Sequence, residues 1–312
     1  MTGPPDVLVL GGGGVLGEAW MNAVLAGLDE PGGFDARESH AFVGTSAGSI
    51  VATALAAGVR PGERLGRLPE QPPVAERELP GARLGISQRV LEAAAGLWST
   101  AAAPLASLAL SSTAAGGAVL RRAALARVPA GRRSLAELRE AIEELGVRWD
   151  GRLLISAVEL ESGRRVMFGA PGAPELRVAD AVLASCAIPG VFRPVRAGGR
   201  SYVDGGAWSP TNMDAAEVVR GSRVLCLNPT GSMRPTIAEP AGAIGPVSRS
   251  VAAAEALALR RRGASVTTIN PDRASVAAMG TNLMDRGPRA AVIAAGLAQG
   301  GALARAGELR FS

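Results

Sequence analysis

Short apolar runs and glycine-rich turns alternate near the start of the chain. An apolar run at residues 7–10 enters four glycines and is followed by a helical pattern at residues 18–28. A second short run at residues 41–43 ends at Gly44 and leads into an apolar helical segment at residues 49–57. Strand, glycine turn and helix thus occur twice in succession, which is typical of an α/β fold with a parallel sheet.

Weaker patterns predict the remaining elements. A capping box, Ser134 to Glu137, starts a helix that ends near Gly146. Asp180 can cap a short helix that ends at Cys186. Residues 152–160 and 164–168 predict a strand hairpin, residues 223–227 and 265–269 two buried strands, and residues 289–305 a terminal helix.

One long segment interrupts this alternation. Residues 93–120 carry no charge, but serine, threonine, glycine and a proline make the run too weakly hydrophobic for a clear membrane span. We expect one or two Ala-rich helices that form the wall or lid of a binding site. Five arginines follow at positions 121, 122, 127, 132 and 133. They fit either peripheral contact with an anionic membrane surface or a solvated arginine face.

The chain organisation follows from these features. There is no internal repeat and no linker that clearly divides the sequence. We therefore expect one domain over residues 1–312, with a cap or lid insertion at residues 61–133.

Composition excludes several functions. The 33 basic residues are all arginine, so Schiff-base lysines and a P-loop lysine are excluded. The charge of +5 favours an anionic partner, yet the chain lacks the aromatic and basic interleaving of nucleic-acid-binding proteins. With 3% aromatic residues, the core must rely on close packing of small side chains. The oligomeric state stays open.

The cysteines and the single histidine argue against a metal site. Cys186 and Cys226 form no CxxC pair, and a single histidine cannot build a His-rich metal site. We expect buried thiols, no metal and no cofactor. The first ten residues resemble a strand rather than a signal peptide, so we expect a cytoplasmic protein, peripheral to a membrane if the arginines contact one.

The most specific motif is Gly44-Thr-Ser-Ala-Gly48, at a strand-to-helix turn. A serine in such a turn is exposed above the sheet, and flanking glycines remove Cβ atoms that would collide with neighbouring elements. The positive end of the following helix favours the developing alkoxide. Ser46 is therefore a candidate nucleophile, although a Gly-rich chain can match this pattern by chance.

A second glycine motif, from Gly11 to Gly17, also lies between a strand and a helix. Successive N–H groups at a helix N-terminus bind anions. The ligand could be a dinucleotide, because Gly12, Gly14 and Gly17 satisfy the fingerprint, or the oxyanion of an acyl-transfer intermediate. The acidic residue that a dinucleotide site needs is not evident, because Asp35 lies in a loop.

Either the base is something other than histidine, or Ser46 is not catalytic. The single histidine, His40, precedes Ser46, and none follows it. Asp204 follows the apolar pair Tyr202-Val203. Gly205 and Gly206 come after it and leave room beside its side chain. Partial desolvation would raise the pKa of this carboxylate and make it a better base, although an Asx turn is the ordinary role of such an aspartate.

Together these motifs resemble the patatin-like phospholipase family. The resemblance rests on residues 12–17, 44–48 and 204–206 in that order, and on Ile188-Pro-Gly-Val-Phe192. It implies a Ser46–Asp204 dyad without histidine, an oxyanion hole from the N–H groups of Gly12, Gly13 and Gly14, and supporting glycines. The supporting positions are Gly17, Gly44, Gly48, Gly205 and Gly206. One departure is Leu16, where many members carry Arg or Lys.

We therefore expect a three-layer α/β/α domain with a mostly parallel central sheet and an Ala-rich helical insertion. The expected function is hydrolysis of lipid acyl esters through an acyl-enzyme. Two alternatives stay open: a dinucleotide-binding protein that uses the first glycine loop, and a catalytically silent lipid-binding module.

Overall fold

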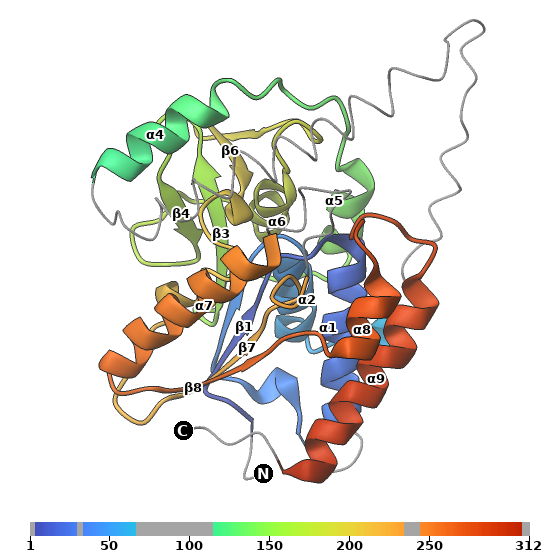
Figure 1. Ribbon diagram of the computed structural model, residues 1–312. Helices are drawn as coiled ribbons and strands as arrows, with labels where there is room; N and C mark the ends of the chain where they lie inside the picture. Colours follow the sequence, from blue (N-terminus) through green and yellow to red (C-terminus); the bar gives the residue numbers. More distant parts are fainter. Residues whose placement is uncertain (1–3, 30–33, 67–114, 234–243, 308–312) are drawn as a thin grey trace, which may run out of the picture.

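Helices cover both faces of a central β-sheet (Figure 1). The structure, a computed structural model, describes residues 4–29, 34–66, 115–233 and 244–307. Within these ranges the sheet has eight strands, in the order β5-β6-β3-β2-β1-β7-β8, with β4 paired to β3. The strands are β1 (Val7–Leu10), β2 (Ala41–Gly44), β3 (Leu153–Glu159), β4 (Arg165–Phe168), β5 (Val195–Ala197), β6 (Arg200–Asp204), β7 (Arg223–Leu227) and β8 (Ser265–Ile269).

The sheet is mixed and mostly parallel. The five strands from β3 through β2, β1 and β7 to β8 are parallel, with Leu10 opposite Gly44 and Leu227. Antiparallel pairing is confined to the other end, where β3 pairs with β4 and β6, and β6 with β5. The expected sheet class and the β3–β4 hairpin are therefore confirmed.

The period-two alternation along β1 separates two apolar layers. Leu8 and Leu10 pack with Trp20 and Val51 of the first two helices, whereas Val7 and Val9 pack with Ala256 and its neighbours on the opposite face. Every residue of β1 is buried because both faces are covered. The helices are α1 (Gly14–Asp29), α2 (Ala47–Ala56), α4 (Ala115–Leu125), α5 (Ala136–Glu143), α6 (Val178–Cys186), α7 (Ile244–Arg261), α8 (Arg273–Met279) and α9 (Arg289–Ala306).

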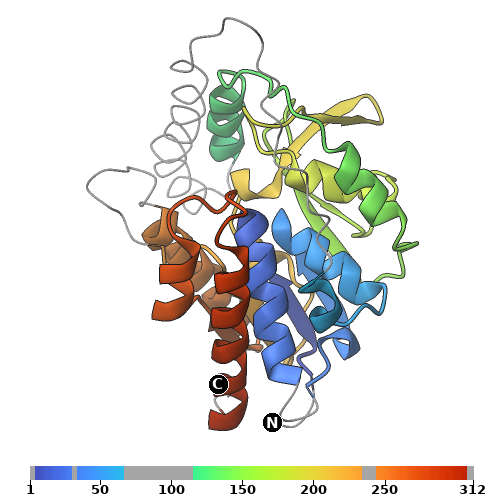
Figure 2. The same cartoon turned by 90° about the vertical axis from the view of Figure 1, so that its right-hand side faces the viewer.

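Small residues bring helices close together, as the composition predicts. Helices α1 and α9 lie side by side along much of their length (Figure 2). A Cβ on Gly296 of α9 would lie 2.8 Å from the Ala23 Cβ of α1, and one on Gly27 would lie 2.9 Å from the Gly301 nitrogen. Larger side chains at these positions would push the helices apart.

Three elements differ from the expectations. Helix α6 starts at Val178 after Arg177, so Asp180 lies in its first turn rather than at its cap. Helix α5 starts at Ala136 with Leu135 as its N-cap, so Ser134 is not the capping residue that the sequence predicts. The Ala136 N–H donates to the Ser134 hydroxyl at 3.2 Å. The sequence patterns did not predict α7, which carries the second apolar layer.

Most of the expected insertion lies outside the described residues. Of the uncharged run at 93–120, the structure describes only residues 115–120, at the start of α4. The expected wall or lid at 93–120 and the insertion at 61–133 therefore stay predictions. In the described parts of the chain, no helix combines the length and apolarity needed to span a bilayer.

Candidate active site

Ser46 lies in the sharp turn between β2 and α2. Its backbone has φ 51° and ψ −123°, an unusual conformation for a residue with a side chain. Such conformations cost about 1–3 kcal/mol and persist where the surroundings enforce them. The residue is 8% exposed. The turn thus holds the Ser46 hydroxyl at the end of a strand, at the start of a helix.

The glycines on either side of Ser46 are required by close packing. A Cβ on Gly44 would lie 2.6 Å from the Ser49 Cα. A Cβ on Gly48 would overlap the Leu10 carbonyl of β1 and would lie 2.8 Å from the Gly11 carbonyl oxygen. Helix α2 can therefore start directly against β1 only because these positions lack side chains.

Asp204 ends β6 and is buried, with 5% of its surface exposed. Strand β3 lies between the two candidate residues: its Ile155 pairs with Gly44, just before the Ser46 turn, and its Ala157 pairs with Asp204. Neighbouring strands are about 4.8 Å apart, so the side chains of Ser46 and Asp204 can meet above β3. The structure thus brings together two residues that are far apart in the sequence.

The environment of Asp204 suits a general base. Burial raises the pKa of its carboxyl from 3.8 to about 6, against the lowering effect of hydrogen bonds from the Ser46 side chain and the Gly206 N–H. The Gly206 nitrogen lies 2.7 Å from Oδ1. A carboxylate with a pKa near neutrality is still ionised at pH 7, yet accepts a proton more readily than an exposed one.

The C-terminal end of α6 contacts both residues of the pair. The Ser46 N–H donates to the Ser185 hydroxyl at 2.8 Å, and the Asp204 N–H donates to the Ala187 carbonyl at 3.0 Å. The sequence analysis missed Ser185. The Ile188-Pro-Gly-Val-Phe192 block that follows was its only signal, because it marks where the helix must end.

The first glycine loop lies beside Ser46. A Cβ on Gly12 would be 3.5 Å from the Ser46 Cβ. However, the Gly12 N–H donates to the Pro210 carbonyl at 2.8 Å. Within the described residues, the N–H groups of Gly13 and Gly14 have no acceptor. Of the three glycines predicted to form the oxyanion hole, Gly12 therefore has its N–H engaged. The predicted donors that are left are Gly13 and Gly14, at the N-terminus of α1.

Other glycines of the motifs support the loops. A Cβ on Gly17 would lie 3.0 Å from the Pro229 Cβ, and a Cβ on Gly205 would lie 2.6 Å from the Ser156 carbonyl oxygen. Gly206 supplies the N–H that holds Asp204. Leu16 is fully buried in the core, so this position presents an apolar side chain to the protein interior.

The single histidine lies away from the site. His40 precedes β2, at the opposite end of that strand from Ser46, and 81% of its side chain is exposed. Its Nδ1 is 3.6 Å from an Asp6 carboxylate oxygen. His40 is therefore a surface residue. Cys186 and Cys226 are free and buried, as expected.

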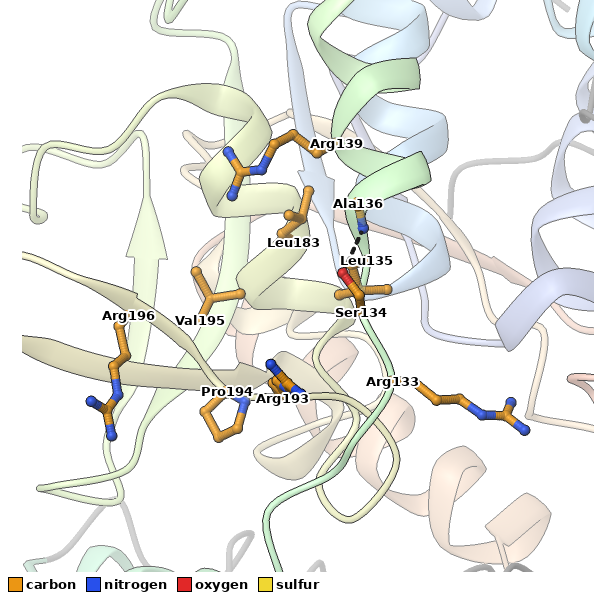
Figure 3. Close-up of a pocket in the computed structure, with 10 residues that line it drawn as sticks. All are labelled: Arg133, Ser134, Leu135, Ala136, Arg139, Leu183, Arg193, Pro194, Val195 and Arg196. Atoms are coloured by element: carbon orange, nitrogen blue, oxygen red, sulfur yellow. Dashed lines mark hydrogen bonds between the residues drawn. The ribbon is translucent and has the colours of Figure 1, made fainter. Parts of the chain in front are cut away.

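An arginine-lined cavity of about 260 Å³ lies between α5, α6 and β5. It is lined by Arg133, Ser134, Leu135, Ala136, Arg139, Leu183, Arg193, Pro194, Val195 and Arg196. The side chains of Arg133 and Arg196 point away from each other (Figure 3), and Arg139 is paired with Asp180. The guanidinium groups therefore do not converge on one anion, and the cavity does not include the Ser46–Asp204 pair.

Comparison with known proteins agrees with this geometry. The model of the family described as patatin-like phospholipase matches residues 8–71 and 152–217. These two segments carry the glycine loop and Ser46, and Asp204. The resemblance to the patatin-like phospholipase family is therefore confirmed over these two segments.

No curated protein matches the sequence. Among solved structures, the crystal structure of VipD from Legionella pneumophila matches with a TM-score of 0.44 and 14% identity, over 97% of this chain and 67% of that one.

Proposed function

We propose that this protein hydrolyses a carboxylic ester of a lipid through a Ser46–Asp204 dyad and an acyl-enzyme. One observation carries the proposal: a serine in a strained turn is hydrogen-bonded to a buried aspartate whose pKa is raised to about 6. An ordinary Asx turn needs neither the burial of Asp204 nor the strain at Ser46.

In the first half-reaction, the Ser46 Oγ attacks the ester carbonyl carbon while Asp204 takes the hydroxyl proton. The carbonyl oxygen becomes an oxyanion, which the N–H groups of Gly13 and Gly14 stabilise by hydrogen bonds. The tetrahedral intermediate then collapses. Its carbon–oxygen bond to the alcohol breaks, and the alcohol takes the proton from Asp204.

In the second half-reaction, water attacks the acyl-enzyme and Asp204 accepts its proton. The intermediate collapses to release the fatty acid and restore the Ser46 hydroxyl. Each step uses one carboxylate that alternates between base and acid. A pKa close to neutrality suits both roles because neither protonation state is strongly disfavoured.

The position of the glycine loop favours this function over dinucleotide binding. Gly12 lies against Ser46, and β2, the strand after the loop, ends in Gly44 rather than an acidic residue. A pyrophosphate at this helix N-terminus would have to share the space beside the serine hydroxyl. An oxyanion formed on a substrate bound to Ser46 would occupy this same space beside the serine.

The experiment compares Ser46→Ala with the wild-type protein. A fluorophosphonate should label wild type at Ser46 and inactivate it, and Ser46→Ala should lose about 10⁴–10⁶-fold in ester hydrolysis. Ala fits the turn with less bulk, so thermal unfolding of the variant serves as the folding control. Residual activity above about a thousandth of wild type would contradict a nucleophilic Ser46. Absence of labelling together with tight dinucleotide binding would favour the alternative function.

We also propose that the face around α4 contacts an anionic membrane surface. Val119 and Leu120 are 64% and 48% exposed, and Arg122 and Arg127 are exposed beside them. No carboxylate occurs between residues 115 and 133. Exposed apolar and cationic side chains together are typical of helices that lie on anionic bilayers.

Arg121 connects α4 to the segment that follows Asp204. It is 4% exposed, and its guanidinium carbon lies 4.0 Å from the centre of the Trp208 ring. Its Nε donates to the Ala207 carbonyl at 3.2 Å. Burial, together with the nearby Arg165, lowers the pKa of Arg121 to about 10, so it stays charged at neutral pH.

Vesicle binding tests the membrane proposal. The triple change Arg122→Gln, Arg127→Gln and Arg132→Gln should weaken binding to vesicles that contain phosphatidylserine, and salt should weaken the binding of wild type. Hydrolysis of a short soluble ester should be unchanged. Equal binding of the triple variant and wild type would overturn this proposal but leave the dyad intact.

A further inference from the structure

Asn212 is a fully buried residue in the segment that follows Asp204. Its backbone is left-handed, with φ 49° and ψ 30°. In the described part of the chain, Ser46 and Asn212 are the two residues other than glycine with positive φ. Asparagine tolerates this conformation better than most residues. The left-handed backbone alone would therefore explain why an asparagine stands at this position. A further role for Asn212 has to rest on its side-chain contacts.

The side-chain amide of Asn212 connects three neighbouring strands. Its Nδ2 lies 3.1 Å from the Thr45 Oγ1, just after β2, and 3.2 Å from the Ser156 Oγ of β3. It also lies 3.3 Å from the Gly205 carbonyl oxygen, just after β6. Thr45 is adjacent to Ser46, and Gly205 is adjacent to Asp204. One amide group therefore reaches the neighbours of both residues of the dyad.

The orientation of this amide follows from its partners. A carbonyl oxygen can only accept a hydrogen bond, and Nδ2 lies 2.7 Å from the Ser209 carbonyl in addition to that of Gly205. On the other side, Arg165 donates to the Asn212 Oδ1 at 3.3 Å. Arg165 is itself held by Asp214, with 2.9 Å between its Nη2 and a carboxylate oxygen. A flipped amide would place oxygen against two carbonyl oxygens.

Helix α7 packs against the Asn212 segment and holds it through the buried side chain of Glu255. The Glu255 carboxylate accepts the Met213 N–H at 2.9 Å and the Thr211 hydroxyl. Asn212 thus has a buried anchor on each side in the sequence. The Asn212 amide is therefore held in place by contacts that do not involve the neighbours of the dyad, as a positioning group must be.

We propose that Asn212 is a positioning residue that sets the separation of Ser46 and Asp204. The inference rests on the proposed function, because positioning matters only if the two residues act together. Ser46 and Asp204 come from strands on either side of β3. The C-terminal end of α6 bonds to the backbone of both residues, and the Asn212 amide adds contacts that cross β3. Small displacements of reacting groups cost about 100-fold in rate.

The first test is Asn212→Gly, which keeps the left-handed backbone and removes the amide. We expect kcat for a short soluble ester to fall about 100-fold, with KM within about threefold of wild type. Asn22→Ala is the matched control, because Asn22 is also a buried asparagine, and among the described residues its side chain bonds only to Glu18 within α1. The control should lower thermal stability while kcat stays within about twofold of wild type.

The pH profile provides a readout that a merely structural role would not change. The hydrogen bond from Ser46 lowers the pKa of Asp204. If loss of the amide separates the pair, the apparent pKa in kcat/KM should rise in Asn212→Gly relative to wild type, and fluorophosphonate labelling should slow. The control should change neither. An unchanged pH profile together with unchanged labelling would overturn the inference.

Asn212→Asp gives a second variant if Asn212→Gly folds poorly. It keeps the side-chain shape but places an oxygen where the donor has to be, so the same loss of kcat is expected. If either folded variant has kcat within twofold of wild type while Ser46→Ala is inactive, the positioning role is wrong and the dyad stands. If Ser46→Ala remains active, the proposed function itself fails.

Discussion

The Ser46 turn and the Asp204 loop reach their geometry by different physical routes. The turn is defined by residues next to each other in the sequence, with Gly44 and Gly48 allowing α2 to start against β1. The loop is defined by partners from other parts of the chain, among them Ala187 and Ser156. A nucleophile can thus be specified by a five-residue motif, whereas the basicity of its partner depends on burial that the whole fold creates.

The largest expected effect tests the Asp204 loop and the role of Asp204 as the base. Asp204→Asn preserves shape but removes the proton acceptor, so ester hydrolysis should fall about 10⁴-fold. Fluorophosphonate labelling of Ser46 should slow as well, because the hydroxyl loses its base. Steady-state kinetics and labelling rates check this. If activity survives in Asp204→Asn but not in Ser46→Ala, then the turn functions without the loop and another base must be sought.

A glycine substitution tests the first route. Gly48→Ala should lower the free energy of unfolding by about 3 kcal/mol, because the new Cβ would overlap the Leu10 carbonyl. Chemical denaturation measures the change. Gly62→Ala is the control, since a Cβ there would meet open space. Equal stability of the two variants would show that the turn does not depend on close approach of α2 to β1.

The pH dependence of stability tests the burial of Asp204. The pKa of Asp204 is raised from 3.8 to about 6 in the folded protein. Between these values the folded state holds the proton more tightly than the unfolded state, so stability falls as pH rises from about 4 to about 6. Above pH 6 the buried charge carries its full cost. Asp204→Asn should therefore be more stable than wild type at pH 8, by about 2–3 kcal/mol, and not at pH 4.

Denaturant melts of both proteins at the two pH values measure this difference. A stabilisation that is the same at pH 4 and pH 8 would mean that packing, not the buried charge, distinguishes the variants. In that case the raised pKa could not explain the basicity of Asp204.

The smallest expected effect is that of His40→Ala. The side chain is 81% exposed and lies at the other end of β2 from Ser46. Activity should stay within about twofold of wild type, since surface substitutions of this kind change stability by about 0.5 kcal/mol or less. Loss of activity in this variant, with activity retained in Asp204→Asn, would reverse the assignment of the base.

Much of the fold could be predicted because its signals are local. The strand at residues 7–10, the strands at 223–227 and 265–269, and the turn at Gly44–Gly48 depend on short apolar runs and on glycines that near neighbours require. Helix α7 escaped prediction although it covers one face of the sheet. Half of its apolar aliphatic residues are alanines, and serine, glutamate and arginine lie among them, so the periodic contrast is weak.

The proposed nucleophile Ser46, the glycine loop and Asp204 were all evident as motifs, since the proposed chemistry needs particular residues at close spacing. The roles of Ser185 and Asn212 were not. Ser185 bonds to the Ser46 backbone and Asn212 to the adjacent Thr45. These hydrogen bonds link segments far apart in the sequence, at separations of 139 and 167 residues. Likewise, the engagement of the Gly12 N–H by Pro210 became clear only from the fold. Hydrogen bonding and desolvation depend on what surrounds an atom in space, and these surroundings arise only when the strands pack together.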